Sequence, residues 1–172
     1  MDISPPSTLP GTPEEARTQA LAWLEGVLTG ERDPWANLAN AAAVLFGCLP
    51  GLNWAGFYLL RGGELVLGPF QGRPACVRIP LDRGGCGAAA RTRSIQRVDD
   101  VLQFEGHIAC DAASRSELVV PLMLGSRLLG VLDLDSPLPG RFSEEDAQAM
   151  QAAAGMIASA CDWALAALDP AD

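Results

Sequence analysis

The sequence contains no lysine, a single histidine and a single tyrosine, and no apolar run approaches the length of a membrane span. All twelve basic residues are arginine, and 21 acidic residues outnumber them, so the net charge is −9. Because so acidic a chain repels phosphate backbones and anionic lipids, neither nucleic acid nor a membrane surface is an expected partner. The N-terminus lacks the basic and apolar regions of a signal peptide, so we expect a cytoplasmic protein.

Cysteine occurs five times, an odd number for a scaffold held by disulfides. In a reducing compartment these cysteines should rest as thiols, which favours chemistry over a disulfide scaffold. The 172 residues, 49% of them hydrophobic, suffice for one folded domain with a substantial core. We expect a loose Pro-rich tail over residues 1–11 and a single catalytic domain over residues 12–172.

Helix-start signals occur near both ends of the chain. Thr12-Pro13-Glu14-Glu15 combines an N-cap, a proline at the first helical position and a carboxylate three residues after the cap. The predicted helices cover residues 12–30, 33–46 and 143–168, and Gly47 is the expected stop of the second helix. The candidate buried positions of the last helix are Met150, Ile157, Cys161, Leu165 and Leu168.

Between these helices, short apolar runs alternate with Gly-containing turns, a pattern typical of antiparallel strands. The predicted strands cover residues 53–60, 64–70, 76–80, 94–98, 118–124 and 128–135. The segments between them are a Gly-rich loop over 82–87, a short helix over 88–93 and a long irregular segment over 99–116. The sequence therefore predicts an α+β fold in which N- and C-terminal helices flank a central antiparallel β-sheet.

The segment from His107 to Glu117 contains the only histidine, a cysteine and several polar residues among small ones. It lies directly before a buried strand, in the kind of long loop that is usually functional. Cys110, surrounded by Ala and Ser and close to charged groups, is a candidate for a partly exposed, reactive thiol. The alternative is a buried structural cysteine, as we expect for Cys48 and Cys161.

Three cysteines beside loops, Cys76, Cys86 and Cys110, leave several chemistries open. With His107 they could bind zinc, although no Cys-x-x-Cys pair is present. A cysteine hydrolase would need His107 as its base, which a position three residues upstream does not establish. A redox cycle uses several thiols at once, because one thiol is oxidised to sulfenic acid and another resolves it as a disulfide.

Two acids, Asp133 and Asp135, lie two residues apart on a predicted strand and so point to the same face. Either they line a solvent-facing edge, or they serve a cavity in which one carboxyl stays protonated and acts as a general acid. A strict two-residue turn at Gly125-Ser126 puts Glu117 on the opposite face from them. A bulge or a three-residue loop would instead put Glu117 directly opposite Asp135.

Five segments together resemble the free methionine-(R)-sulfoxide reductases, which are built on a GAF domain. The resemblance covers about residues 14–165, and the three cysteines at the family's spacing make it specific. The segments are Asn53 to Tyr58, Gly68 to Cys76, Gly84 to Gly87, His107 to Glu117 and Gly130 to Ser136.

The resemblance implies reduction of free, not protein-bound, methionine-R-sulfoxide. Cys110 resembles the nucleophile that becomes sulfenic acid, Cys76 the principal resolving cysteine and Cys86 a possible second one. Glu117, Asp133 and Asp135 match the acids that bind the substrate's ammonium or protonate the sulfoxide oxygen, and Trp54 and Tyr58 match the aromatic wall beside its methyl group.

The resemblance further implies a homodimer without a metal or other cofactor, supplied with electrons by thioredoxin or a small dithiol. The order in which Cys76 and Cys86 act and the identity of the proton-donating acid stay open at this point. The alternative, from another functional class, is a non-catalytic GAF module that senses a small ligand or redox state.

Overall fold

The computed structural model of the protein describes residues 11–103 and 112–166. These residues form two N-terminal helices, then strands interrupted by a third helix, and a last helix. The elements are α1 (Pro13–Leu28), α2 (Pro34–Cys48), β1 (Trp54–Arg61), β2 (Glu64–Gly72), β3 (Arg78–Pro80), α3 (Gly84–Thr92), β4 (Gln96–Val98), β5 (Ser116–Leu124), β6 (Arg127–Ser136) and α4 (Glu144–Ala160). Two 3-10 turns, η1 (Val101–Gln103) and η2 (Trp163–Ala166), complete them.

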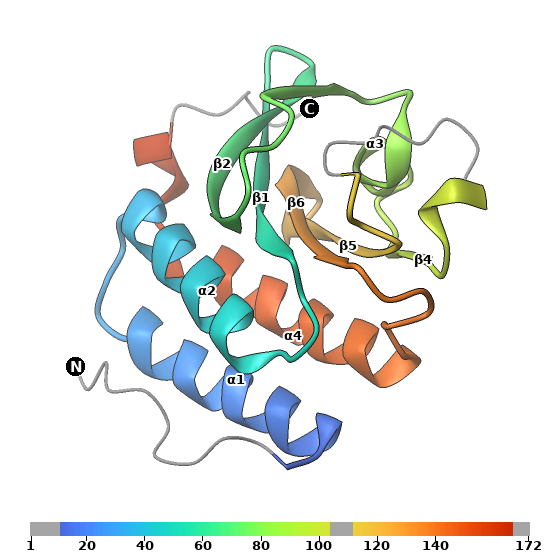
Figure 1. The fold of residues 1–172 in the computed structure, drawn as a ribbon. Helices are drawn as coiled ribbons and strands as arrows, with labels where there is room; N and C mark the ends of the chain where they lie inside the picture. Colours follow the sequence, from blue (N-terminus) through green and yellow to red (C-terminus); the bar gives the residue numbers. More distant parts are fainter. Residues whose placement is uncertain (1–10, 104–111, 167–172) are drawn as a thin grey trace.

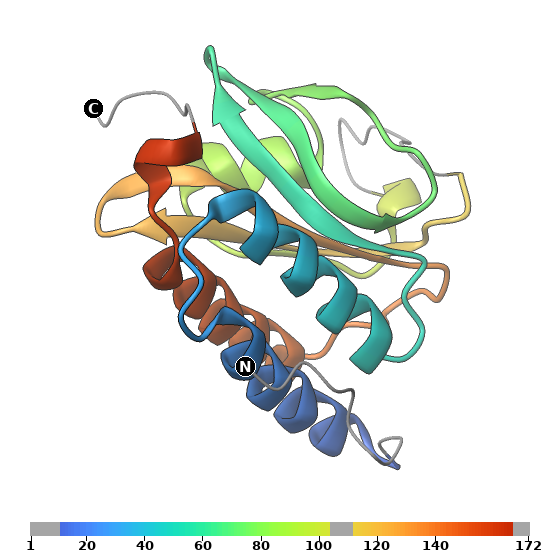
Figure 2. The ribbon, with the colours of Figure 1, turned by 90° about the vertical axis from the view of Figure 1, so that its left-hand side faces the viewer.

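The strands form one antiparallel sheet in the order β3-β2-β1-β6-β5-β4. Helices α2 and α4 pack on one face of this sheet, and α1 packs across both of them, whereas α3 packs on the other face (Figures 1 and 2). The larger apolar core lies between the sheet and α1, α2 and α4. The predicted α+β class, with an antiparallel sheet flanked by terminal helices, is confirmed.

The predicted helix starts are confirmed because the capping groups bond as their spacing requires. The Thr12 hydroxyl accepts from the Glu15 N–H at 3.2 Å, and the Glu15 carboxylate accepts from the Thr12 N–H at 3.0 Å. At α4 the same reciprocal pair forms between Ser143 and Asp146. These caps fix where the two outer helices begin.

Two helix ends were predicted wrongly. Helix α2 runs through Gly47 to Cys48, since apolar contacts of its last turn outweigh the preference of glycine for a helix end. Helix α4 stops at Ala160, because the next N–H groups bond elsewhere: the Asp162 N–H donates to the Arg32 carbonyl at 2.8 Å. Leu165 consequently lies in η2 and is 59% exposed, not buried.

The Gly-rich segment predicted as a loop is the first turn of α3, which begins at Gly84. Gly84 has a φ of +65°, a conformation that favours glycine. A Cβ atom on Gly87 would overlap the carbonyl oxygens of Pro80 and Leu81. The glycines therefore serve close packing of α3 on the chain before it, and this packing brings α3 down onto the sheet.

No helix among the described residues is long and apolar enough to cross a membrane. The predicted Pro-rich tail falls on residues 1–11, of which only Gly11 is described, and Leu168 also lies outside the described residues.

Candidate active site

The candidate site lies on the sheet face that α3 covers, where three central strands align polar and aromatic side chains. In the ladder Trp54 pairs with Asp135, which in turn pairs with Glu117. One step along, Gly56 pairs with Asp133 and Asp133 with Val119. The three predicted acids thus come together from β5 and β6, beside the aromatic residues of β1.

A bulge in the β5–β6 hairpin puts Glu117 on this face. The turn at Gly125-Ser126 has two residues, with Leu124 opposite Arg127, but the register shifts after Met123 so that Leu122 pairs with Gly130. The shift leaves one extra residue, Leu129, on β6. The bulged hairpin anticipated from sequence is confirmed, and the alternative with Glu117 on the opposite face is wrong.

Glu117 and Asp133 are buried, with 8% and 5% of their surfaces exposed. Within the described part of the chain, Glu117 Oε2 and Asp133 Oδ1 have no hydrogen-bond donor. Burial, and then the charge of Asp135, raises the pKa of Glu117 to about 8. Burial, then the charges of Asp135 and Glu117, raise the pKa of Asp133 well above its ordinary value. Glu117 therefore favours the protonated form near neutral pH.

Cys86 lies against these acids from the first turn of α3. Its Sγ atom is 4.0 Å from Glu117 Oε1, and Cys86 Sγ and one oxygen each of Glu117 and Asp133 lie within 4.8 Å of one another. Burial first, then the charge of Asp133, raises the pKa of the Cys86 thiol. A Cβ on Gly85 would overlap the Glu117 carboxylate, so this glycine allows α3 to approach the acids.

An aromatic wall stands beside the acids. The rings of Trp54 and Tyr58 stack with centroids 5.8 Å apart, and Trp54 stacks on Phe70 at 5.4 Å. The Tyr58 hydroxyl donates to the Cys76 carbonyl at 3.1 Å. Burial, followed by the charge of Asp133, raises the pKa of Tyr58. Sequence reasoning identified Trp54 and Tyr58 but missed Phe70. The sequence signal that could have indicated Phe70 is the glycine opposite it. Phe70 pairs with Gly56, and a Cβ atom on Gly56 would overlap the Phe70 side chain.

The cysteines separate into two groups. Cys48, Cys86 and Cys161 are free and buried, whereas Cys76 is disulfide-bonded. A sulfur in a disulfide is not available as a zinc thiolate, so this structure does not form the zinc set that included Cys76. His107 and Cys110 lie outside the described residues, as does Asp111.

Contacts fix the chain on both sides of that undescribed segment. On one side Asp100 accepts from Arg115 in an ion pair at 3.0 Å, which lowers the pKa of Asp100, and the Val101 N–H donates to the Arg115 carbonyl. On the other side Ser114 accepts from Asn53 at 3.0 Å. These contacts fix Asp100 and Val101 before the undescribed segment and Ser114 and Arg115 after it.

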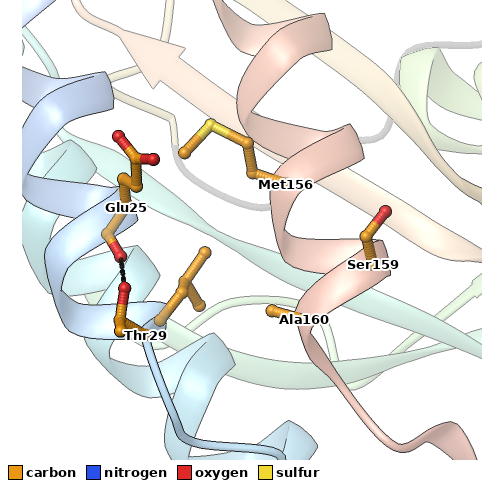
Figure 3. Close-up of a pocket in the computed structure, with 6 residues that line it drawn as sticks. Glu25, Thr29, Met156, Ser159 and Ala160 are labelled. Carbon is orange, nitrogen blue, oxygen red and sulfur yellow. Dashed lines mark hydrogen bonds between the residues drawn. The ribbon is translucent and has the colours of Figure 1, made fainter.

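A surface groove of about 320 Å³ lies between α1 and α4, on the opposite side of the sheet (Figure 3). Its lining residues are Glu25, Leu28, Thr29, Met156, Ser159 and Ala160. The hydroxyl group of Thr29, which lines the groove, donates to the Glu25 backbone carbonyl at 2.8 Å. The groove contains no group of nucleophiles or buried acids comparable to the site on the α3 face.

Comparison with known proteins identifies the family. The family model of the GAF domain matches residues 36–161. The chain is 54% identical over 125 residues to a free methionine-R-sulfoxide reductase of Escherichia coli, which covers 73% of this chain and 76% of that protein.

Two solved structures superpose closely. A free methionine-R-sulfoxide reductase from Neisseria meningitidis, in complex with its substrate, has a TM-score of 0.85 at 41% identity and covers 91% of this chain and 95% of its own. A putative GAF sensor protein from Burkholderia vietnamiensis has the same TM-score at 47% identity and covers 91% and 99%.

Proposed function

Since the chain belongs to the GAF-domain family of free methionine-R-sulfoxide reductases, we propose that it reduces free L-methionine-(R)-sulfoxide to methionine. The observation that carries this proposal is the pair of buried carboxyl oxygens, on Glu117 and Asp133, that have no donor in the described part of the chain. A free amino-acid sulfoxide supplies a partner for each: its ammonium group binds Asp133, together with Asp135, and its sulfoxide oxygen accepts the proton of Glu117. A peptide nitrogen carries no such charge, so the pocket favours the free amino acid.

The aromatic wall supports the orientation of the substrate. Trp54, Tyr58 and Phe70 offer a flat apolar surface adjoining the acids, suited to the substrate's methylthio end. With the ammonium among the carboxylates and the methyl group at the rings, only one sulfoxide epimer can present its oxygen to a protonated carboxyl. The arrangement thereby selects one epimer, which the relatives indicate to be the R form.

Cys110 acts as the nucleophile in this mechanism. Its thiolate attacks the substrate sulfur, the sulfoxide oxygen is protonated, and as the substrate's S–O bond breaks the resulting hydroxyl group passes to the Cys110 sulfur. The substrate sulfur gains two electrons and leaves as methionine, while Cys110 loses two and becomes a sulfenic acid. Glu117, whose pKa is raised to about 8, is the best-supported proton donor, and Asp133 and Asp135 hold the ammonium.

Cys76 then displaces water from the Cys110 sulfenic acid and forms a disulfide. Cys76 is disulfide-bonded in this structure, whereas Cys86 is a free thiol. This difference leaves Cys86 as the second candidate and favours Cys76 as the principal resolving cysteine. Its neighbour Val77 is 64% exposed, so a reductant can approach. Thioredoxin or a small dithiol supplies the two electrons without another cofactor, in a cytoplasmic homodimer.

A comparison of two cysteine variants tests the proposal against the alternative of a non-catalytic GAF sensor. Cys110→Ser should lose dithiothreitol-driven turnover while still binding methionine-R-sulfoxide in calorimetry. The control Cys161→Ser, a buried cysteine at the end of α4, should keep turnover. Full turnover by Cys110→Ser would refute the nucleophile, and binding without turnover by the wild type would favour the sensor.

A further inference from the structure

Among the described residues, Cys86, Glu117 and Asp133 form a group of possible metal ligands. Each offers one ligand atom, and the three atoms lie within 4.8 Å of one another. The thiol comes from α3 and the carboxylates from β5 and β6, so three separate elements enclose one point. All three residues are buried, which excludes bulk water from around that point.

The spacing is close to that of a tetrahedral zinc centre. Zinc lies at about 2.3 Å from a thiolate sulfur and about 2.1 Å from a carboxylate oxygen, which puts two such ligands roughly 3.6 Å apart. The observed distance between Cys86 Sγ and Glu117 Oε1 is 4.0 Å. For this pair of atoms, closing the gap takes an adjustment of a few tenths of an ångström.

Unpaired acceptors provide the second, independent indication. Glu117 Oε2 and Asp133 Oδ1 are buried, and no donor in the described part of the protein reaches either oxygen. A bound cation would compensate both at once, since cations are often the largest local charges in such sites. The mixed sulfur and oxygen donors favour zinc over magnesium or calcium, which take oxygen ligands.

We propose that Cys86, Glu117 and Asp133 form a binding site for one divalent cation of the zinc type, with a fourth position left for water. Binding exchanges the thiol proton and the carboxylic protons for the metal. In so far as the proposed function holds, the cation occupies two acids that contact the substrate, so zinc inhibits competitively and a chelator restores activity.

Cobalt(II) tests the site without reference to turnover. The full-length Cys76→Ser/Cys110→Ser double variant removes the two cysteines proposed to form the disulfide and leaves Cys86. We expect one equivalent of Co²⁺ to give a near-ultraviolet thiolate-to-cobalt charge-transfer band, which Zn²⁺ abolishes by displacement. Adding Cys86→Ser should remove the band and weaken zinc binding at least about tenfold, whereas adding Cys161→Ser should preserve both.

A second variant guards against loss of folding. Glu117→Gln in the same background keeps the shape of the side chain and should also weaken zinc binding about tenfold or more, with an unchanged circular dichroism spectrum. A band that survives Cys86→Ser, or a double variant that takes up no metal, would overturn the inference.

Wild-type kinetics separate this inference from the proposed function. We expect Zn²⁺ to raise the apparent KM for methionine-R-sulfoxide without changing kcat. An active enzyme without the Cys86-dependent band refutes the metal site alone. An inactive protein that shows the band supports the metal site and refutes the proposed function.

Discussion

Buried acids occur on both faces of the sheet, and the two faces treat them differently. On the side of α1, α2 and α4, Asp146 accepts from Arg17 at 3.0 Å and from Arg141 at 2.9 Å. Although burial acts to raise the pKa of Asp146, the bonds from Ser143, Arg17 and Arg141 outweigh it and lower that pKa. On the α3 side, Glu117 lacks any such cation among the described residues, and its pKa is raised to about 8.

The contrast indicates what each acid contributes. Asp146 links α1 to α4 and caps the latter, so its charge stabilises the fold. Glu117 and Asp133 have unpaired buried oxygens, an arrangement that costs stability and that a packed core would not need. The free energy lost there is recovered when a cationic ligand binds. Stability and chemistry are thus assigned to opposite faces of one sheet.

The largest expected effect is a loss of turnover from a substitution on the face covered by α3. Glu117→Gln keeps the shape but removes the transferable proton, so kcat for methionine-R-sulfoxide should fall about 10²- to 10⁴-fold. Glu64→Gln, an acid on the same sheet paired with Arg78 at the surface, is the matched control and should leave kcat unchanged. Turnover by Glu117→Gln within twofold of wild type would transfer the proton donor's role to another acid.

The next largest effect is a loss of stability on the face covered by α1, α2 and α4. Asp146→Asn leaves Arg17 and Arg141 without their buried partner and should lower the free energy of unfolding by about 3 kcal/mol, measured with urea. Turnover per folded molecule should not change. A variant of unchanged stability but reduced turnover would break the proposed division between the faces.

The pH dependence of stability should distinguish the two faces as well. Glu117 binds a proton more tightly in the folded protein, so its contribution is fully present below about pH 4.5 and declines as the pH rises to about 8. Between pH 6 and 9, in chelator-containing buffer, wild type should lose about 2 kcal/mol more than Glu117→Gln. Parallel urea profiles for the two proteins would show that the Glu117 pKa is not raised.

The smallest expected effect is a change in KM from a substitution in the aromatic wall of Trp54, Tyr58 and Phe70. Phe70→Leu removes the ring that stacks on Trp54 at 5.4 Å and should raise KM for methionine-R-sulfoxide about three- to tenfold, with little change in kcat. Phe142→Leu, a buried ring outside the site, should leave KM unaltered. Equal changes in both variants would remove Phe70 from the substrate pocket.

Local signals in the sequence predicted most of the fold. Capping residues such as Thr12 and Ser143 determine helix starts through bonds within four residues, and Gly62-Gly63 determines a hairpin in the same way. The helix ends were harder to predict. They depend on distant groups, such as the Arg32 carbonyl that bonds just past α4.

The candidate site was only partly predictable. The period of two along a strand puts Asp133 and Asp135 on one face, but the face of Glu117 depends on a bulge that the turn residues do not specify. The approach of Cys86 to Glu117 depends on α3 beginning at Gly84 and packing through its glycines. Such contacts between elements leave no periodic trace in the sequence.

The central claim, that the α3 face binds a free amino-acid sulfoxide, is tested most directly by substrate selectivity. Dithiothreitol-driven turnover should be measured with free methionine-R-sulfoxide, its S epimer and a peptide-bound R-sulfoxide, with the thiols first shown to be reduced. The account predicts turnover of the free R form alone. Equal turnover of the peptide-bound form would contradict the role of Asp133 and Asp135 as the site for the substrate's ammonium group.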